Sequence, residues 1–333
     1  MLNPDQKLNP KLFDADVEQI YIRTGFGEGL LKAGEMDQRV VGLCADLVES
    51  THMLGFKMKF PERYIEIGVA EQNLATVASG MAAMGKIPFM TSYAMFSPGR
   101  NWEQIRTTIC YNNVPVKIAG AHAGISVGPD GGTHQALEDM AIMRALPRMV
   151  VISPCDSIEA RKATIAAAKT PDPTYIRLAR EKTPVMTTDD TPFQIGKAQI
   201  VFKSKNSSSK NSVGIIATGA LLYKALKVAK KLDEEGKNVT VLNVSTIKPL
   251  DEQAIIHLAH ETRALVTVEE HQIAGGMGSA VAECLAAHFP VPIEFIGVKD
   301  QFGQSGRPDE LIELYEMGEK HIYQAVQKVL IRK

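Results

Sequence analysis

The chain has 333 residues, of which 45% are hydrophobic, and a formal net charge of −1. This balance is typical of a globular protein with two or three α/β modules, and it gives no electrostatic basis for binding nucleic acid or an anionic membrane. Because the four cysteines form no CxxC pair, and neither a membrane span nor a signal-peptide core is evident, we expect a cytoplasmic protein with reduced thiols.

Amphipathic helices alternate with short apolar strands in the first part of the chain. Helices are predicted at 20–33, 74–84, 101–111, 137–146 and 160–168. Strands are predicted at 40–43, 64–67, 87–91, 116–119, 149–152 and 174–178. This alternation favours a mostly parallel sheet flanked by helices. Proline and Asp-Asp breaks predict a linker at 181–192.

A second α/β series begins near Phe193. The stretch Lys203–Ser212 contains only Ser, Asn and Lys, which predicts an exposed loop. The predicted strands are 213–217, 239–244, 264–268 and 293–295, and the predicted helices are 221–235, 252–258, 276–288 and 322–330. We therefore expect two α/β domains with mostly parallel sheets, at 1–190 and 191–333.

Glu71 stands where a predicted strand gives way to a mostly buried helix. It follows Tyr64–Ile67 and precedes apolar residues at helical spacing from Leu74 to Ala82. A charged carboxylate that is buried without a partner costs several kcal/mol, so Glu71 is paired, protonated or used in chemistry. A glutamate in the first helical turn is also favoured by the helix dipole alone, so Glu71 by itself leaves both interpretations open.

A glycine-rich loop carries two histidines and an aspartate. It reads His-Ala-Gly-Ile-Ser-Val-Gly-Pro-Asp-Gly-Gly-Thr-His-Gln from His122 to Gln135. Glycine lets the backbone approach a ligand closely, and histidines at both ends favour recognition of hydroxyl or phosphate groups over a plain surface turn. The long His-to-His spacing argues against a metal site, and the glycines do not form a dinucleotide fingerprint.

A second glycine cluster follows the predicted strand 264–268. It reads Glu-Glu-His-Gln-Ile-Ala-Gly-Gly-Met-Gly-Ser from Glu269 to Ser279. Glycines between a strand and a helix can hold a phosphate, but the two adjacent carboxylates would repel one. We therefore prefer close helix-to-sheet packing and a subunit contact as the interpretation. Met140, Met143 and Met149 are expected to fill the core.

Two segments together resemble the C-terminal half of transketolase. These are Val-Ala-Glu-Gln-Asn at 69–73 and Gly-Pro-Asp-Gly-Gly-Thr-His-Gln at 128–135, in this order and at about this separation. The resemblance runs from about Tyr21 to Val329. It implies a pyrimidine-binding domain and a C-terminal domain of a thiamine-diphosphate enzyme. Such an enzyme transfers a two-carbon ketol unit from a ketose phosphate to an aldose phosphate.

The resemblance also implies which residues bind the cofactor. Glu71 matches the glutamate that hydrogen-bonds N1′ of the aminopyrimidine so that C2 of the thiazolium can lose its proton. An apolar setting that raises the pKa of this carboxyl suits the role. Phe96 and Tyr93 match the aromatic wall on which the pyrimidine stacks, although periodicity alone would make both ordinary core residues. Asp46 is a further cofactor-binding candidate.

Six residues match substrate-binding positions of the family. Those that match contacts to sugar hydroxyls near the reacting carbons are Asp130 and His134, and His134 is also a catalytic candidate. Those that match the phosphate end are Arg23, Ser50, His122 and Arg180. Arginine suits this role because its fork can hold two phosphate oxygens.

The chain departs from the family pattern in three places. Ala123 stands where many transketolases have Asp, and 96–102 replaces an aromatic-rich stretch, so donor preference and a third stacking residue stay open. The Gly-Asp-Gly segment that binds the diphosphate and its metal is missing. The resemblance therefore implies a partner subunit carrying that segment with Mg²⁺ or another divalent ion, in an α2β2 heterotetramer, with this chain inactive alone and holding no metal ligand.

Three alternatives compete with the split transketolase. The C-terminal half of deoxyxylulose phosphate synthase has a related loop, but it usually carries His where Asn73 and Gln135 stand here. The β subunit of a 2-oxoacid dehydrogenase lacks the Gly-Pro-Asp-Gly-Gly-Thr-His loop. A non-catalytic assembly subunit is disfavoured because Glu71 and both loop histidines are retained.

Overall fold

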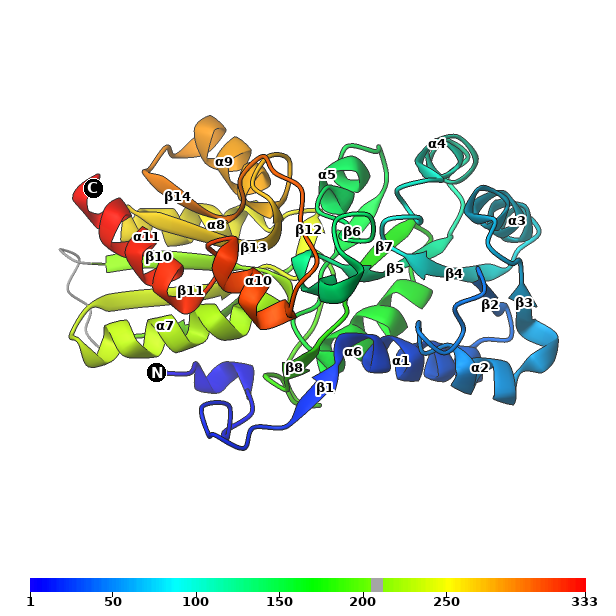
Figure 1. Cartoon of the computed structure of the whole chain (residues 1–333), viewed down its shortest axis with the longest axis horizontal. Helices are drawn as coiled ribbons and strands as arrows, with labels where there is room; N and C mark the ends of the chain where they lie inside the picture. Colours follow the sequence, from blue (N-terminus) through cyan, green and yellow to red (C-terminus); the bar gives the residue numbers. More distant parts are fainter. Residues whose placement is uncertain (205–211) are drawn as a thin grey trace.

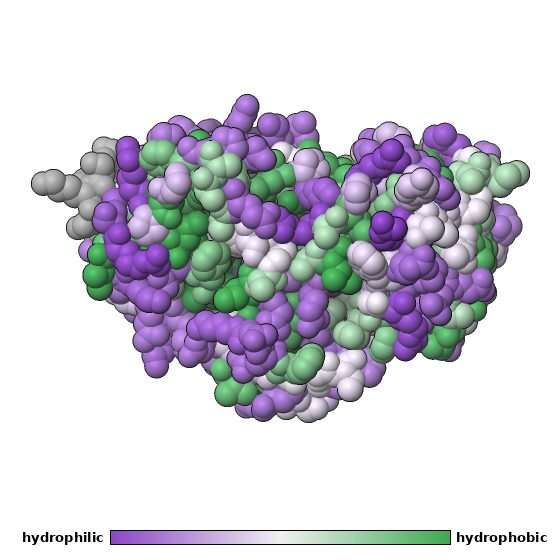
Figure 2. Space-filling view, turned by 90° about the horizontal axis from the view of Figure 1, so that it is seen from above, coloured by the Kyte–Doolittle hydropathy of each residue, from purple (hydrophilic) through white to green (hydrophobic). Residues whose placement is uncertain are grey.

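The computed structural model describes residues 1–204 and 212–333. Two α/β modules lie side by side along the long axis of the molecule (Figure 1). The predicted exposed loop Lys203–Ser212 falls largely outside the described residues. Seen from above, the outline of the molecule is notched where the two modules meet (Figure 2).

The first module is built on a seven-stranded sheet in the order β12-β6-β7-β5-β4-β2-β3. Its strands are β2 (Val40–Cys44), β3 (Tyr64–Glu66), β4 (Ile87–Tyr93), β5 (Lys117–Ala123), β6 (Val150–Ile152), β7 (Thr174–Ala179) and β12 (Thr246–Lys248). Its helices are α1 (Ile22–Met36), α2 (Leu54–Lys59), α3 (Glu71–Ala83), α4 (Trp102–Gln104), α5 (Asp139–Arg144) and α6 (Ser157–Ala168). A π-helical segment, Ile105–Tyr111, continues α4.

Helices cover both faces of this sheet, as the alternation of elements predicted. The core on one face joins α1 and α6 to the strands, whereas α3, α4 and α5 lie on the other face (Figure 1). Strands β2, β5 and β7 are buried along their whole length, which explains why most of their residues are small or apolar. Met140, Met143 and Met149 are core residues, which confirms the prediction made for them.

The segment 181–192 is not a free linker, and the prediction is wrong over its first half. Lys182–Pro184 forms β8, which pairs antiparallel with β1 (Gln19–Tyr21). The backbone N–H groups of Met186 and Thr187 donate to the buried carboxylate of Asp156, at 2.7 and 2.6 Å. The same carboxylate caps α6, so one charged group fixes the chain as it leaves the first module.

The second module is built on a five-stranded sheet in the order β14-β13-β10-β11-β9, in which only β9 is antiparallel. Its strands are β9 (Gln199–Lys203), β10 (Ser212–Ala217), β11 (Asn238–Asn243), β13 (Leu265–Gln272) and β14 (Ile293–Val298). Its helices are α7 (Leu222–Glu234), α8 (Glu252–Thr262), α9 (Met277–His288), α10 (Pro308–Leu314) and α11 (Glu319–Ile331). The mostly parallel sheet is again as predicted.

Two segments tie the modules together across their boundary in the sequence. Strand β12 follows β11 in the chain but adds an antiparallel edge to the sheet of the first module. The N-terminal arm does the reverse, because Asn3 and Met1 exchange backbone hydrogen bonds with Val201 and Lys203 of β9. No helix in the described residues is both long and apolar enough to cross a membrane.

Candidate active site

The residues singled out in the sequence follow successive strands at the carboxyl edge of the first sheet. Arg180 comes directly after β7, His122 is the next-to-last residue of β5, Tyr93 ends β4, and Asp46 follows β2. Because these strands are parallel neighbours, their carboxyl ends meet at one edge, where open α/β sheets bind ligands. Glu71 begins α3, the helix that follows β3 after a short loop, at the far end of this row.

The Glu71 carboxylate is buried and paired. Its side chain is 2% exposed, and Arg100 donates from Nη1 to Oε2 at 2.7 Å. The Ser92 hydroxyl lies 3.4 Å from Oε1, and the Asn101 amide donates to the Glu71 carbonyl at 2.8 Å. The carboxylate therefore faces a guanidinium and a hydroxyl inside the fold. A role limited to the helix dipole would not require this burial.

An aromatic wall continues the row from Glu71. The Arg100 guanidinium lies over the Phe96 ring, 4.8 Å from its centroid. Phe96 meets the edge of His134 at 5.4 Å, and the Tyr93 ring lies 4.1 Å from that of His122. Phe96 and Tyr93 are only half-buried, so they are not ordinary core residues and their faces can receive a planar group.

Arg23, Arg180 and His122 form a group at the other end of the row, which we call the cationic group after its two arginines. His122 occupies the left-handed region at φ 55°, beside a register shift between β5 and β7. Burial, and then the nearby Arg23 and Arg180 cations, lower the pKa of His122 to about 3, so its imidazole is neutral at pH 7. Arg23 donates to the Arg180 carbonyl, and burial also lowers the pKa of Arg23.

Two buried polar atoms in this cationic group are free to bind an anion. His122 Nδ1 and Arg23 Nε are buried and have no hydrogen-bond partner among the described residues. Unpaired buried polar groups are costly and rare in folded proteins. Glu181 pairs with Arg180 at 3.2 Å but is 43% exposed. An anionic ligand would satisfy both atoms and balance the charge.

The glycine-rich loop approaches the second module closely. A Cβ atom at Gly124, where φ is 94°, would collide with the Glu270 carboxylate, and one at Gly131 would press on the Ser305 hydroxyl. Glu270 accepts the Ser126 backbone N–H at 2.6 Å. The glycines are therefore explained by packing between modules, which fixes the loop that presents His134. Close approach of the backbone to a ligand, which the sequence led us to expect, is not required to explain these glycines.

Three predicted residues lie outside this contiguous row of contacts. Asp130 is exposed in the loop, and Ser50 is half-buried in a turn after β2. Asp46 is exposed at φ 58°, and its backbone N–H donates to the Glu66 carboxylate at 2.7 Å. Contacts of these three with a cofactor or substrate stay predictions.

Sequence reasoning missed the residues that support the site. Arg100 lay in a segment noted only for its lack of aromatics, and no periodicity marks it as the partner of Glu71. His52 sits in the left-handed region beside Thr24, with Nδ1 at 3.4 Å from the hydroxyl. Burial and the Arg23 charge lower the pKa of His52. Glu66, at the end of β3, accepts from Tyr64 and from two backbone amides.

The second glycine cluster does not hold a phosphate here. The Glu269 carboxylate accepts the backbone N–H groups of Met277 and Gly278, at 2.7 and 2.8 Å. It therefore fills the amino end of α9 that an anion would otherwise use. A Cβ at Gly276 would collide with the same carboxylate, so the structure agrees with close helix-to-sheet packing.

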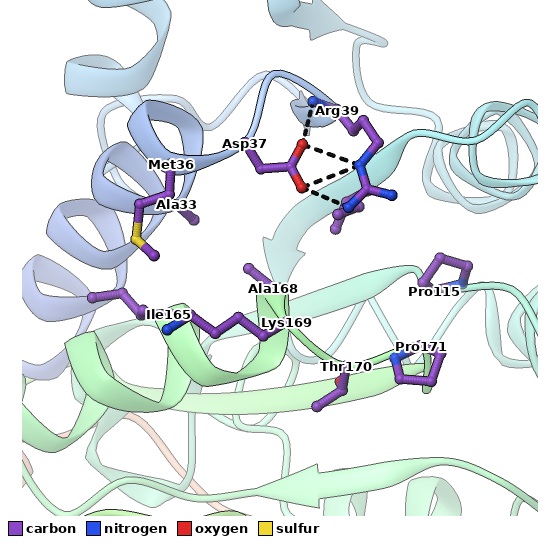
Figure 3. Close-up of a pocket in the computed structure, with 11 residues that line it drawn as sticks. Ala33, Met36, Asp37, Arg39, Pro115, Ile165, Ala168, Lys169, Thr170 and Pro171 are labelled. Carbon is purple, nitrogen blue, oxygen red and sulfur yellow. Dashed lines mark hydrogen bonds and ion pairs between the residues drawn. The ribbon is translucent and has the colours of Figure 1, made fainter.

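A cavity of about 530 Å³ lies between α1 and α6, away from this edge (Figure 3). It is lined by Ile87 and Pro115 at the amino ends of β4 and β5, which is the edge opposite the carboxyl ends. Asp37 and Arg39 at its rim already pair with each other at 2.7 Å. Its size alone does not make it the reaction site, because none of the candidate residues reaches it.

Comparison with known families identifies both modules. Residues 18–186 match the model of the transketolase pyrimidine-binding domain, and residues 203–322 match that of the transketolase C-terminal domain. The chain is 38% identical to the 6-deoxy-6-sulfo-D-fructose transketolase subunit of Clostridium sp. (strain MSTE9), over 96% of this chain and 98% of that one. It is 34% identical to a subunit of the apulose-4-phosphate transketolase of Phocaeicola vulgatus, over 91% and 95% of the two chains.

A solved structure agrees in fold over nearly the same span. It is described as a split-gene transketolase in an inactive β4 tetramer. The TM-score is 0.85 at 40% identity, and the alignment covers 94% of this chain and 99% of that one. These matches do not favour the synthase or dehydrogenase alternatives.

Proposed function

The chain belongs to the transketolase family as a subunit of a split enzyme, and we propose that its carboxyl-edge row is one half of a composite active site. In this proposal Glu71 and the aromatic wall receive the aminopyrimidine of thiamine diphosphate, and the cationic group receives the anionic end of a ketose. The partner supplies the diphosphate and divalent-metal site. The observation that carries the proposal is the row of contacts from Glu71 through Arg100, Phe96, His134 and Tyr93 to His122, whose pKa the Arg23 and Arg180 charges lower.

The residues around Glu71 fit an aminopyrimidine. The Arg100 guanidinium is a planar N–H donor that hydrogen-bonds Glu71 and lies over the Phe96 ring. An aminopyrimidine needs the same two contacts, a carboxyl partner at N1′ and an aromatic face. The bound cofactor supplies the nucleophilic carbon that adds to the ketose carbonyl. Glu71 holds and shares the proton at N1′ of the aminopyrimidine. For this, the Arg100 guanidinium gives up its hydrogen bond to Glu71 Oε2 when the aminopyrimidine binds.

His134 stands between the two ends of the row, and we propose that it contacts the sugar near the reacting carbons. Its Nδ1 lies 2.9 Å from the Thr133 hydroxyl, and its ring meets Phe96 and Tyr93. In the proposal His134 hydrogen-bonds hydroxyl groups of the sugar and steers a proton to the acceptor oxygen. Asp130 on the same loop is proposed to bind a more distant hydroxyl.

The cationic group selects donors that carry an anion at the end distal to the carbonyl. Arg23 and Arg180 supply charge-assisted hydrogen bonds, and neutral His122 can donate one without adding charge. Ser50 is proposed as a further contact. A phosphate satisfies this chemistry, and so does the sulfonate of the donor named for the Clostridium relative. We propose a ketose phosphate as the donor and an aldose phosphate as the acceptor.

The partner is proposed to be an N-terminal-half transketolase chain, in an α2β2 heterotetramer with Mg²⁺ or another divalent ion. This is supported by the absence of a Gly-Asp-Gly segment from the sequence. It is also supported by the subunit names of the relatives and by the inactive β4 state of the similar structure. The four cysteines are buried free thiols, which fits the cytoplasm as the compartment.

Reconstitution tests this proposal. The purified chain alone should show no ketol transfer, and it should gain activity when the N-terminal-half chain, thiamine diphosphate and Mg²⁺ are added together. Omitting any one of the three serves as the control and should abolish turnover. Robust turnover by the isolated chain would overturn the composite site.

A further inference from the structure

A cluster of three metal-ligating side chains lies in the second module, outside the row described above. Glu252 begins α8, whereas Cys284 and His288 lie one turn apart near the end of α9. One ligand atom from each of the three side chains lies within 4.8 Å of the others. They line a cavity of about 510 Å³ between the two helices. Figure 1 shows α9 in the second module, well away from α3 in the first.

The histidine is already oriented as metal ligands usually are. His288 Nδ1 lies 2.8 Å from the backbone carbonyl of Cys284, which can only accept a hydrogen bond. The proton therefore sits on Nδ1, and Nε2 keeps its lone pair. A ring N–H donated to a backbone carbonyl is the contact that fixes the tautomer of metal-bound histidines.

The three side chains of the cluster differ in their exposure to solvent. Cys284 is only 6% exposed, whereas Glu252 and His288 are exposed, so the cluster opens to solvent on one side. A divalent cation between these groups would relieve the repulsion between a thiolate and the carboxylate.

The cations that share the cavity already have partners. Arg144 donates to the Glu283 carboxylate, and Lys248 donates to the carbonyls of Arg144 and Leu146. They therefore do not neutralise Glu252 by direct pairing. The carboxylate stays available to a ligand that enters the cavity.

We propose that Glu252, Cys284 and His288 bind one transition-metal cation, with Zn²⁺ the best-suited ion, and that this ion clamps α8 to α9. A sulfur, an imidazole nitrogen and a carboxylate oxygen are ligands that Zn²⁺ accepts, and water from the open side completes a tetrahedral set. The thiol loses its proton to solvent as the Cys284–metal bond forms. Such soft ligands do not suit Mg²⁺, so this ion is separate from the one proposed to accompany the diphosphate.

Titration of the metal-free chain with Co²⁺ and Zn²⁺ tests the site. Co²⁺ should bind at one equivalent per chain, with visible bands of tetrahedral intensity and a thiolate-to-cobalt charge-transfer band that Zn²⁺ removes. Cys284→Ser should abolish the charge-transfer band. His288→Gln and Glu252→Gln should each weaken binding about tenfold or more, since losing even an outer-sphere partner costs 10–100-fold. Zn²⁺ should raise the Tm of the natural chain but not of Cys284→Ser.

Matched controls separate this site from general metal affinity. Glu283→Gln removes a carboxylate from the same cavity, and His257→Gln removes an exposed histidine from α8; both should leave binding unchanged. Circular dichroism of the metal-free variants checks that they fold. Absence of the charge-transfer band in the natural chain, or its survival in Cys284→Ser, would overturn the proposal. So would binding that falls equally in the two control variants.

Discussion

Replacing Arg180 by Ala should weaken capture of donors that end in an anion. A hydrogen bond to a charged group contributes about 1.5–3 kcal/mol. The Arg180 side chain is 30% exposed, so we take the lower end of this range. About 1.5 kcal/mol corresponds to a roughly tenfold rise in KM. Steady-state kinetics of the reconstituted enzyme should show this rise with ketose phosphates and little change with hydroxypyruvate, which is too short to reach the cationic group.

Arg180 also supports the loop, and a second variant separates the two roles. Its Nη1 donates to the Val127 carbonyl at 3.0 Å. Arg180→Lys keeps the charge, so it should recover part of the KM for phosphorylated donors. An equal loss for ketose phosphates and hydroxypyruvate in Arg180→Ala would refute the anion-binding role, because it would mean that Arg180 maintains the loop or the cofactor end.

Two further perturbations test the charges in the row. Arg100→Ala should lower the unfolding free energy, measured by urea unfolding, by about 1 kcal/mol, a value discounted because Arg100 is 49% exposed. In a Glu71→Gln background the same substitution should cause almost no further loss. Equal losses in both backgrounds would contradict the pairing of Arg100 with Glu71. The pKa of His122 in the folded chain, about 3, lies below its unfolded value near 6.5, so the unfolded state binds the extra proton and stability falls as pH drops through this window. His122→Asn should therefore make the acid limb of stability against pH shallower by up to about 1.4 kcal/mol per pH unit, and an unchanged slope would show that His122 is protonated in the fold.

Periodicity predicted the parallel sheet, and the resemblance to transketolase supplied the residues expected at its carboxyl edge. Apolar strands alternating with helices fix a parallel sheet, and residues that follow such strands must meet at one edge. Glu71 and His122 stood out as residues after predicted strands, whereas Arg180 was named only through the resemblance. Their order along the sheet follows from pairing between distant strands, which no local pattern encodes.

What the sequence did not predict depends on contacts between segments far apart in the chain. Strand β12 joins the first sheet although it follows β11, and the loop glycines fit against Glu270 and Ser305 of the second module. The pairing of Arg100 with Glu71 spans 29 residues and carries no spacing signal. The linker prediction was wrong over the first half of 181–192, because β8 pairs with β1 and Asp156 binds the backbone that follows.

Deuterium exchange at C2 of bound thiamine diphosphate measures the proposed role of Glu71 most directly. In the reconstituted enzyme, Glu71→Gln should slow exchange by about 100-fold or more, since a positioned acid–base group typically contributes 10²–10⁴-fold. Glu62→Gln, which alters an exposed carboxylate before β3, should exchange at the natural rate. Near-natural exchange in a folded, partner-bound Glu71→Gln enzyme would contradict the account, because it would mean that Glu71 only interacts with the helix dipole.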